Sequence, residues 1–552
     1  MSFLSDIFVQ LGAAGGATLL RELRETGEGD ATGGALLRSV EQARGFLAAK
    51  GLQKGDRCVL LAVNSIRWVA MDLAIMAEGV IVVPLYARQA APELVAMMKD
   101  CEPSLIVCGD NALRDAISAN WPEAAECVLL DDVFGSRPLQ RAQGAGHPEV
   151  EERDPVAIIY TSGTSGEAKG VVLDAGNLAH MLGCTSERLD ALMENRLGQD
   201  HVYHYLPFCF AGSWILLLSC LRRGSLLSLN TDLTRIPLEM ASVAPDYFLN
   251  VPQLLERMRK AVDEQLTNKG GFALKAYNNA RLAWMRKREG KASFADALWL
   301  RLGNAVVFPA IRKKMVGGNL RALICGSAPL TLETQLFFMS LGIQVLQVYG
   351  LTETTAICTM DIPGRAVPGR VGPAIEGIEM KLGDGDEIIV RGPNIFVGYW
   401  NRSQETAKAL REGWFHTGDQ GEMDAAGNWR IIGRMKNLLI LGSGHNIAPE
   451  PIEDEILQQL SAAQQVVLMG NGRGYLSAIV TGKVTREQVQ TVLDSMNAGK
   501  PHYKQVRAFF LRDEPFSIEN GLLTANGKLK RDLIAARFKA EIEEIYAVKR
   551  AG

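Results

Sequence analysis

The sequence lacks the cysteine patterns that disulfide frameworks and zinc clusters require. Nine cysteines are spread through 552 residues, and no two of them form a CxxC pair. Because disulfide frameworks and zinc sites are recognised by paired or regular spacings, neither class of protein is indicated. Isolated cysteines suit a reducing compartment, and we expect a cytoplasmic location.

The sequence also has little excess of charge. Its formal net charge is −3, from 59 Lys and Arg against 62 Asp and Glu, so no nucleic-acid partner is expected. The N-terminus shows no pattern typical of a secretion signal. We expect no membrane-spanning segment either, because we find no apolar stretch that reaches the roughly 18 residues needed to cross a bilayer. These absences leave an ordinary globular protein as the expected class.

Alternating apolar runs and amphipathic segments predict an α/β fold. Residues 56–85 read as strand, helix and strand, with apolar residues three and four apart in the middle segment, which is typical of a βαβ unit. Further short strands are expected at 104–108, 157–160, 226–229 and 320–324. We therefore predict a parallel sheet covered by helices.

The pattern changes in the second part of the chain. From about residue 371, short strands separated by glycine turns predict a small β-rich subdomain. We expect a large domain at residues 1–433, a hinge at 434–437 and a compact mixed domain at 438–552. The last domain is small enough to act as a mobile lid.

One internal segment is strongly basic. Between Arg257 and Lys314 there are fourteen Lys or Arg against four Asp or Glu, within a run of helix-forming residues. Two interpretations stay open. We favour a solvated helical face, and the alternative is a surface that makes peripheral contact with a membrane.

A loop rich in glycine and hydroxyl groups joins two apolar strands at Tyr160–Gly170, which reads YTSGTSGEAKG. Its glycines let backbone amides point at phosphate oxygens, and its hydroxyls and lysine add donors and positive charge. The P-loop of kinases requires GxxxxGK followed by Ser or Thr, which this loop lacks. A Ser/Gly surface turn is the alternative. The candidate anion-binding residues are Thr161, Ser162, Gly163, Thr164, Ser165, Gly166 and Lys169.

YTSGTSGEAKG resembles the phosphate loop of the adenylate-forming superfamily, which contains acyl-CoA synthetases, luciferases and peptide-synthetase adenylation domains. The resemblance extends from about Gln42 to Arg531. It implies a large N-terminal domain of layered sheets and helices and a small mobile α+β C-terminal domain. It also implies ATP-dependent activation of a carboxylic acid to an acyl adenylate in domain 1–433, followed by thioester formation with coenzyme A. Other segments resemble that family's signatures in its order: GSAPL at Gly326, YGLTET at Tyr349, GWFHTGD at Gly413, GRMKNLLILGSGHNIAPEPIE at Gly433 and NGKLKR at Asn526.

The resemblance also implies roles for single residues around ATP. Tyr349 would stack on adenine, Thr352 would donate to the α-phosphate, and Glu353 would bind Mg²⁺ as the metal ligand. Asp419 would accept hydrogen bonds from the ribose hydroxyls, with Arg434 beside it. The remaining residues of the predicted nucleotide pocket are Gly326, Ser327, Ala328 and Gly350.

The C-terminal motifs would serve catalysis and domain movement. Lys528 in NGKLKR would bridge the acid and the α-phosphate during adenylation, and a solvated surface lysine is the alternative. Lys436 matches the family's hinge position. The channel for coenzyme A would run beside Gly442, Ser443 and Gly444. A catalytically idle homologue is disfavoured, because the predicted catalytic side chains are present.

The acyl site is predicted from YLPFCFAGSW at residues 205–214. The family often has a histidine where this chain has Phe210. Trp214 matches a tryptophan that gates the fatty-acid tunnel in some long-chain synthetases, and a buried core tryptophan is the alternative. The basic segment followed by LRALICGSAPL most resembles the long-chain branch, so a long-chain fatty acid is the expected substrate. Medium-chain and aryl acids, and transfer to a carrier protein, are the alternatives.

Overall fold

The computed structural model describes residues 3–25, 27–135, 149–162, 168–194, 198–460, 462–524 and 527–547. The chain forms two compact units, and each is assembled from separate stretches of sequence. The first unit comprises Met1–Met380, Val390–Phe415 and Met423–Trp429. The second comprises Lys381–Ile389, His416–Glu422 and Arg430–Gly552. The predicted domain limits at 433 and 438 stay a prediction.

One sheet of the first unit has the strand order β17-β8-β7-β4-β3-β5-β6. The predicted βαβ unit is confirmed: β3 and β4 pair in parallel, and α3 (Ile66–Ala77) connects them. The Ser65 hydroxyl accepts a hydrogen bond from the Trp68 amide and so caps α3. The strands are β3 (Arg57–Leu61), β4 (Ile81–Leu85), β5 (Leu105–Cys108), β6 (Cys127–Leu129), β7 (Pro155–Ser162), β8 (Ala168–Asp174) and β17 (Gly398–Tyr399).

A second sheet of this unit has the order β14-β13-β12-β11-β9-β10-β1-β2. Its interior pairs are parallel, and its edge strands β14 and β2 are antiparallel. The two large sheets with their covering helices confirm the layered sheets and helices expected for the large N-terminal domain, whereas the apolar pattern alone indicated one parallel sheet. The strands are β1 (Thr18–Arg24), β2 (Gly27–Thr32), β9 (His201–His204), β10 (Leu226–Asn230), β11 (Tyr247–Asn250), β12 (Ala322–Cys325), β13 (Gln344–Tyr349) and β14 (Thr359–Met360).

The core of the first unit follows from the register of these strands. Phe248, Leu323 and Val345 are aligned on neighbouring strands, and all three are completely buried in one hydrophobic cluster. Burial of such a row stabilises both the sheet and the helices packed on it. The main covering helices are α1 (Phe3–Ala14), α2 (Gly33–Ala49), α4 (Ala91–Cys101), α5 (Asn111–Asn120), α6 (Leu130–Phe134), α7 (Ala175–Leu192), α8 (Ala211–Arg223), α9 (Ile236–Val243) and α14 (Leu332–Ser340).

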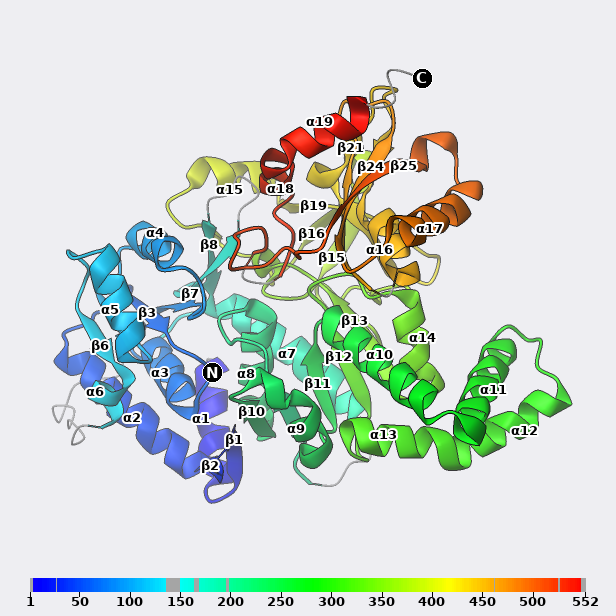
Figure 1. Ribbon diagram of the computed structural model, residues 1–552. Helices are drawn as coiled ribbons and strands as arrows, with labels where there is room; N and C mark the ends of the chain where they lie inside the picture. Colours follow the sequence, from blue (N-terminus) through cyan, green and yellow to red (C-terminus); the bar gives the residue numbers. More distant parts are fainter. Residues whose placement is uncertain are drawn as a thin grey trace. The chain divides into compact units, whose positions relative to one another are not determined.

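The basic segment forms helices between β11 and β12, as the sequence predicted. They are α10 (Pro252–Lys269), α11 (Gly271–Arg288), α12 (Phe294–Leu302) and α13 (Phe308–Val316), with the π-helical turn η2 (Gly303–Val307) joining the last two. We call the part from Gly271 to Val316 the helical arm. In Figure 1 α11 and α12 lie against each other and extend beyond the strands of the eight-stranded sheet.

The helical arm corrects one expectation from the sequence. Residues 294–316 form a continuous helix of 23 residues that is long and apolar enough, by length and composition alone, to cross a membrane. Only 17% of its apolar window is buried. The expectation that no apolar stretch reaches this length was wrong, because the small residues Ala295, Ala297 and Ala305 extend the apolar run between the charged positions.

The β-rich region predicted after residue 371 forms a five-stranded sheet. Its order is β15-β16-β19-β18, with β20 paired to β19. This arrangement confirms short strands separated by glycine turns. The strands are β15 (Glu379–Leu382), β16 (Glu387–Arg391), β18 (Leu410–Arg411), β19 (Trp414–Met423) and β20 (Trp429–Arg434).

The second unit contains a three-stranded sheet of β23 (Ala463–Met469), β24 (Leu476–Gly482) and β25 (Val506–Arg512). Alternate residues of β23 point to opposite faces, so Leu468 joins one hydrophobic cluster and Val467 joins another. Helices pack against both clusters. They are α16 (Glu450–Gln459), α17 (Arg486–Ala498), α18 (Arg531–Arg537) and α19 (Lys539–Ala547), and a small hairpin of β21 (Leu439–Ile440) and β22 (Asn446–Ile447) precedes them.

Candidate active site

The predicted anion-binding loop connects two antiparallel strands. Thr161 of β7 is aligned with Lys169 of β8, so both residues flank the loop. The predicted strand-turn-strand arrangement is therefore confirmed. Gly163, Thr164, Ser165 and Gly166 lie outside the described residues, and so does the side chain of Ser162.

Lys169 is held on two sides. Its Nζ lies 2.6 Å from a carboxylate oxygen of Glu405, on α15 (Ser403–Ala409), and 5.1 Å from the centroid of the Tyr399 ring. The hydrogen bond from Lys169 holds the pKa of Glu405 below its ordinary value. The structure thus places a positive charge at the base of the loop and fixes its position.

Two other predicted motifs follow neighbouring strands. Residues 326–328 come directly after β12, and Tyr349 ends β13, which pairs with β12 in parallel. Because the carboxyl ends of parallel strands meet at one edge of a sheet, the two motifs lie side by side. That edge is where α/β sheets commonly bind ligands.

Close backbone approach explains the glycines of these motifs. A Cβ atom on Gly326 would lie 2.6 Å from Val348 Cγ2, and one on Gly350 would lie 2.3 Å from the Ala356 carbonyl oxygen. Ser327 has a φ of +72°, a conformation that costs energy for any residue with a side chain. The backbone is therefore tightly constrained at residues 326–327 and at Gly350. Such close packing is expected where the adenine ring of ATP must approach the backbone.

Glu353 is joined to the anion-binding hairpin through Tyr399. Thr352 and Glu353 begin the short helix η3 (Thr352–Thr354), and the Tyr399 hydroxyl donates a hydrogen bond to Glu353 Oε1 at 2.8 Å. Tyr399 itself is aligned with Val171 of β8. One tyrosine thus contacts both Lys169 and Glu353, the charged groups predicted to act on phosphates and metal.

Sequence reasoning missed Tyr399 and Glu405. The segment Gly398–Trp400 is visible as GYW, but its pairing with β8 spans more than 200 residues. A lysine-rich or acidic pattern would not have identified Glu405 either, because its contact with Lys169 joins positions more than 200 residues apart in the sequence. Both residues are found only once the fold brings distant segments together.

In the second unit, Asp419 and Arg434 lie together. Arg434 Nε is 2.6 Å from Asp419 Oδ1, and Asp419 is buried. Nearby, the Glu387 carboxylate lies 2.7 Å from His416 Nδ1 and accepts a hydrogen bond from the Gly418 amide at 2.9 Å. These contacts fix the GWFHTGD segment around its aspartate.

Lys436 and Lys528 also belong to the second unit. Lys436 lies in the 3₁₀ turn η5 (Met435–Asn437), where burial and then Arg434 lower the pKa of its ammonium. Lys528 is exposed at a turn in which the Thr524 amide donates to the Lys528 carbonyl at 2.8 Å and the Lys528 amide donates to Thr524 Oγ1 at 3.1 Å. The backbone of this lysine is therefore defined, and its side chain is presented at the surface.

Arg531 anchors the segment that carries Lys528. Its guanidinium donates two hydrogen bonds to the buried carboxylate of Glu453 on α16, one of them 2.7 Å long. A buried carboxylate needs such a partner, because an unpaired buried charge is strongly destabilising. This pair could not be predicted, since its members are 78 positions apart in the sequence.

Gly442, Ser443 and Gly444 lie between β21 and β22, in a tight turn. The Gly442 amide donates to the Arg473 carbonyl at 2.7 Å, and Gly444 has a φ of +81°. Ser443 Oγ is 3.0 Å from His445 Nδ1. The structure therefore shows an ordered turn at this position, and its role in binding coenzyme A stays a prediction.

The two residues predicted for the acyl site lie at the start of α8. Phe210 precedes the helix, is half-buried, and its ring centroid is 5.6 Å from that of Tyr86. Trp214 is completely buried, and its Nε1 donates to Asp72 Oδ2 at 2.9 Å. Burial raises the pKa of Asp72 to about 7. The environment of Trp214 is that of a core side chain, and its gating role stays a prediction.

Within the described part of the chain, no group of three or more His, Cys, Asp or Glu side chains could hold a metal ion. Mg²⁺ in nucleotide sites is commonly bound by one or two carboxylates together with phosphate oxygens and water. Glu353, a single carboxylate at the strand edge, fits that mode of binding.

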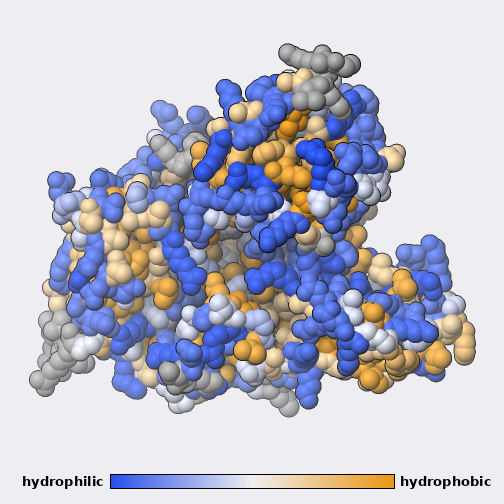
Figure 2. Space-filling model, in the orientation of Figure 1, coloured by the Kyte–Doolittle hydropathy of each residue, from blue (hydrophilic) through white to orange (hydrophobic). Residues whose placement is uncertain are grey.

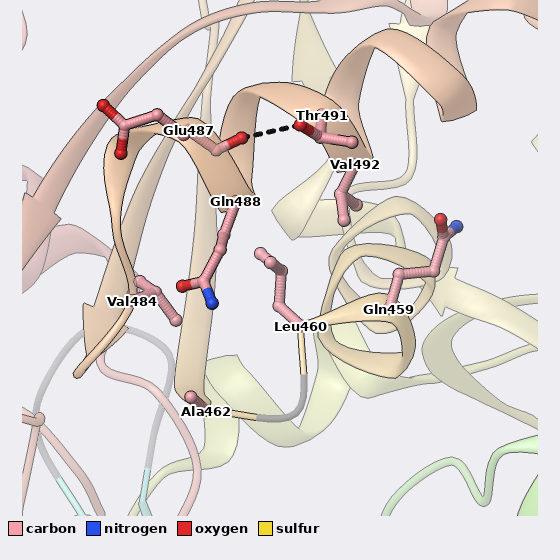
Figure 3. Close-up of a pocket in the computed structure, with 8 residues that line it drawn as sticks. All are labelled: Gln459, Leu460, Ala462, Val484, Glu487, Gln488, Thr491 and Val492. Carbon is pink, nitrogen blue, oxygen red and sulfur yellow. Dashed lines mark hydrogen bonds between the residues drawn. The ribbon is translucent and has the colours of Figure 1, made fainter.

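A cavity in the second unit contains none of the predicted site residues. It has a volume of about 370 Å³ and lies between the end of α16 and α17. Figure 3 shows Leu460 and Val492 at its wall, the carboxylate of Glu487 turned away from it, and Thr491 bonded to the Glu487 carbonyl. This lining offers packing surface and no arrangement of groups for acid activation.

Comparison with known proteins identifies the family. Residues 17–400 match the model of a family described as AMP-binding enzyme. The chain belongs to this family. Residues 436–550 match the model of the AMP-binding enzyme C-terminal domain. The predicted resemblance to the adenylate-forming superfamily is confirmed.

Individual AMP-binding enzymes resemble the whole chain. Long-chain-fatty-acid–CoA ligase FadD15 of Mycobacterium bovis is 26% identical over 563 residues, which cover 94% of this chain and 92% of the relative. Long chain acyl-CoA synthetase 3 of Arabidopsis thaliana is 26% identical, over 91% of this chain and 84% of the relative. The ATP-bound crystal structure of MatB from Rhodopseudomonas palustris has a TM-score of 0.73 and 24% identity, and covers 98% of this chain and 99% of MatB. The last likeness confirms the fold.

Proposed function

We propose that this AMP-forming acid–thiol ligase activates a long-chain fatty acid and transfers its acyl group to coenzyme A. The observation that carries the adenylation step is the contact of Tyr399 with both Lys169 and Glu353. It joins a cationic side chain beside the glycine-rich loop to a carboxylate at the edge of the neighbouring sheet. A nucleoside triphosphate with a bound metal ion requires both kinds of group.

In the first step, the substrate carboxylate attacks the α-phosphorus of ATP. A new oxygen–phosphorus bond forms, and pyrophosphate leaves with the electron pair of the bond that breaks. Because both reactants are anions, positive charge must lower their repulsion. Lys169 would provide it beside the loop, and Lys528 would provide it between the two reactants. When bound, Mg²⁺ with Glu353 as a ligand neutralises phosphate charge.

In the second step, the thiol of coenzyme A attacks the carbonyl carbon of the acyl adenylate. A thioester forms, AMP leaves, and the thiol proton goes to solvent or to a nearby base. We propose that the C-terminal domain turns at Lys436 between the steps, so that Lys528 withdraws and the turn at Gly442–Gly444 borders the pantetheine channel. The hydrogen bonds between Thr524 and Lys528 and the turn at Gly442 support this, because they fix the backbone groups that a rotating domain would present.

The choice of acid rests on the relatives and not on the shape of a pocket. FadD15 and the Arabidopsis synthetase are both named for long-chain acids, and each aligns with nine-tenths or more of this chain. The half-buried rings of Phe210 and Tyr86 supply an apolar surface at the start of α8, which suits a hydrocarbon chain better than a charged acid.

A panel of acids tests the proposed reaction. The purified chain is incubated with ATP, Mg²⁺ and octanoate, palmitate, oleate or benzoate, with and without coenzyme A, and the products are identified by mass spectrometry. We expect coenzyme A-dependent release of AMP and formation of palmitoyl-CoA or oleoyl-CoA, with much less product from benzoate. An acyl adenylate that accumulates unchanged in the presence of coenzyme A would contradict the proposed acceptor. A preference for benzoate would contradict the proposed acid.

A further inference from the structure

We propose that the helical arm is a membrane-contact surface, which lies in the headgroup region of a bilayer containing anionic phospholipids. The inference concerns where the protein binds and not which acid it activates. Three features of the arm support this role: its exposed apolar side chains, its charge, and the way it is fastened to the first unit.

The arm exposes large apolar side chains on two adjacent helices. Phe294 is 93% exposed, Leu298 66% and Val306 60%, along one continuous helix, and Phe272 on α11 is 68% exposed. Figure 2 shows hydrophobic residues gathered over the arm, at the lower right of the view. Single exposed apolar residues are ordinary, but a cluster of this kind is typical of a surface that is covered in use.

The charge around these side chains favours a membrane as the covering partner. Basic residues precede α12 at Lys287, Arg288 and Lys291, and further basic residues close α13. The nearby acidic side chains are neutralised within the arm, because Glu289 pairs with Lys291 and Asp296 with Arg286. An apolar strip bordered by Lys and Arg is the pattern of helices that lie on anionic lipid.

The way the arm is fastened indicates that its long helix lies on the membrane and does not cross it. Phe308 and Val316 of this helix are buried in the core cluster of the first unit. At η2 the helix packs closely on α11, since a Cβ on Gly303 would lie 2.7 Å from Ala280 Cβ. Crossing a bilayer would expose these contacts and place Arg301 in the hydrocarbon, which is costly. Only the outward side is available to lipid.

A second copy of this chain is a less suitable partner. Two helical arms brought face to face would each carry a basic excess, because residues 271–316 contain ten Lys or Arg against two Asp or Glu. Like charges across an interface repel, whereas anionic headgroups attract the same residues. An apolar surface alone would suit either a second copy of the chain or a membrane, and the positive charge of the arm favours the anionic membrane.

Vesicle binding tests the proposal with the full-length protein and no substrate. The protein is sedimented with sucrose-loaded vesicles of phosphatidylcholine alone and of phosphatidylcholine with phosphatidylglycerol. We expect a larger bound fraction on the anionic vesicles and its loss in high salt. The double variant Phe294→Gln/Leu298→Gln should lower the partition coefficient by about tenfold or more, and Lys287→Gln/Arg288→Gln by roughly tenfold.

Val9→Gln is the matched control. Val9 is 67% exposed on α1, outside the arm, and its replacement should leave vesicle binding unchanged. The thermal unfolding midpoint of every variant should stay at the wild-type value, which shows that the surface changes leave the fold intact. Since no acid is present, failure here would not bear on the proposed reaction.

Three results would overturn the proposal. One is wild-type binding to anionic vesicles that is no greater than to neutral vesicles. Another is equal binding by wild type and by Phe294→Gln/Leu298→Gln. If light scattering in the absence of vesicles shows that this variant converts a dimer to a monomer, the arm is a self-association surface and the membrane proposal is wrong.

Discussion

The two lysines assigned to phosphate, Lys169 and Lys528, are supported in opposite ways. Lys169 is half-buried between a carboxylate at 2.6 Å and an aromatic ring at 5.1 Å, so the folded chain fixes its charge. Lys528 is exposed on a turn that hydrogen bonds of Thr524 hold. The folded chain therefore fixes the Lys169 charge beside the loop, whereas the role proposed for Lys528 depends on movement of the segment that carries it.

The largest expected effect comes from removing the positive charge of Lys528. Lys528→Ala should lower the rate of acid-dependent pyrophosphate exchange at least about 10²-fold, because the ammonium would bridge two anions in the adenylation transition state. Conversion of supplied acyl adenylate and coenzyme A to acyl-CoA should stay close to the wild-type rate. Lys530→Ala, two residues away, is the control and should affect neither step by more than a small factor. Exchange at a near-wild-type rate in Lys528→Ala would show that this lysine is an ordinary surface residue.

An intermediate effect is expected from removing the positive charge of Lys169. Lys169→Ala should reduce kcat/KM for ATP by about tenfold, less than the loss at Lys528, because Glu405 already compensates part of its charge. The matched variant Glu405→Gln removes the compensating carboxylate and should lower the KM for ATP. Steady-state kinetics with ATP varied measure both. If the two substitutions change KM in the same direction, the ion pair serves to hold the hairpin and not to bind phosphate.

The smallest effect is expected from the tyrosine between the two charged groups. Tyr399→Phe keeps the ring beside Lys169 and removes the hydroxyl that donates to Glu353 at 2.8 Å. A net hydrogen bond contributes about 1 kcal/mol, so kcat should fall only several-fold, with a change in the Mg²⁺ concentration needed for half-maximal rate. Tyr503→Phe, in the second unit, is the control. If the Mg²⁺ concentration for half-maximal rate does not change in Tyr399→Phe, the prediction that Tyr399 positions Glu353 as a metal ligand is wrong.

The fold class and the local elements could be predicted from the sequence, because they depend on short-range patterns. Apolar spacing in residues 56–85 predicted β3, α3 and β4, and glycine turns predicted the β-rich region after residue 371. The order of the strands within the two large sheets could not be predicted, because strand pairing is a long-range property. The low burial of residues 294–316 could not be predicted either, since apolar composition does not show whether a helix faces the core or the solvent.

For the candidate site, the motifs could be found in the sequence but their partners could not. Lys169, Glu353 and Asp419 were predicted from the order and the residues of the family motifs. The family match confirms the resemblance on which these predictions rest. Glu405 and Tyr399 have no signature of their own. They matter only because the hairpin of β7 and β8 comes to lie beside α15 and β17, and no spacing rule contains that information.

The bond between Arg531 and Glu453 has a consequence for how this protein can change over generations. Arg531 opens α18 three residues after Lys528, and the buried carboxylate of Glu453 depends on its guanidinium. Losing Arg531 alone leaves the buried Glu453 carboxylate without its cation, whereas replacing both by apolar residues of similar size can be nearly neutral. A substitution of Arg531 should therefore be accompanied by one of Glu453, and descendants of this chain should show the two as a covarying pair although they are 78 positions apart in the sequence.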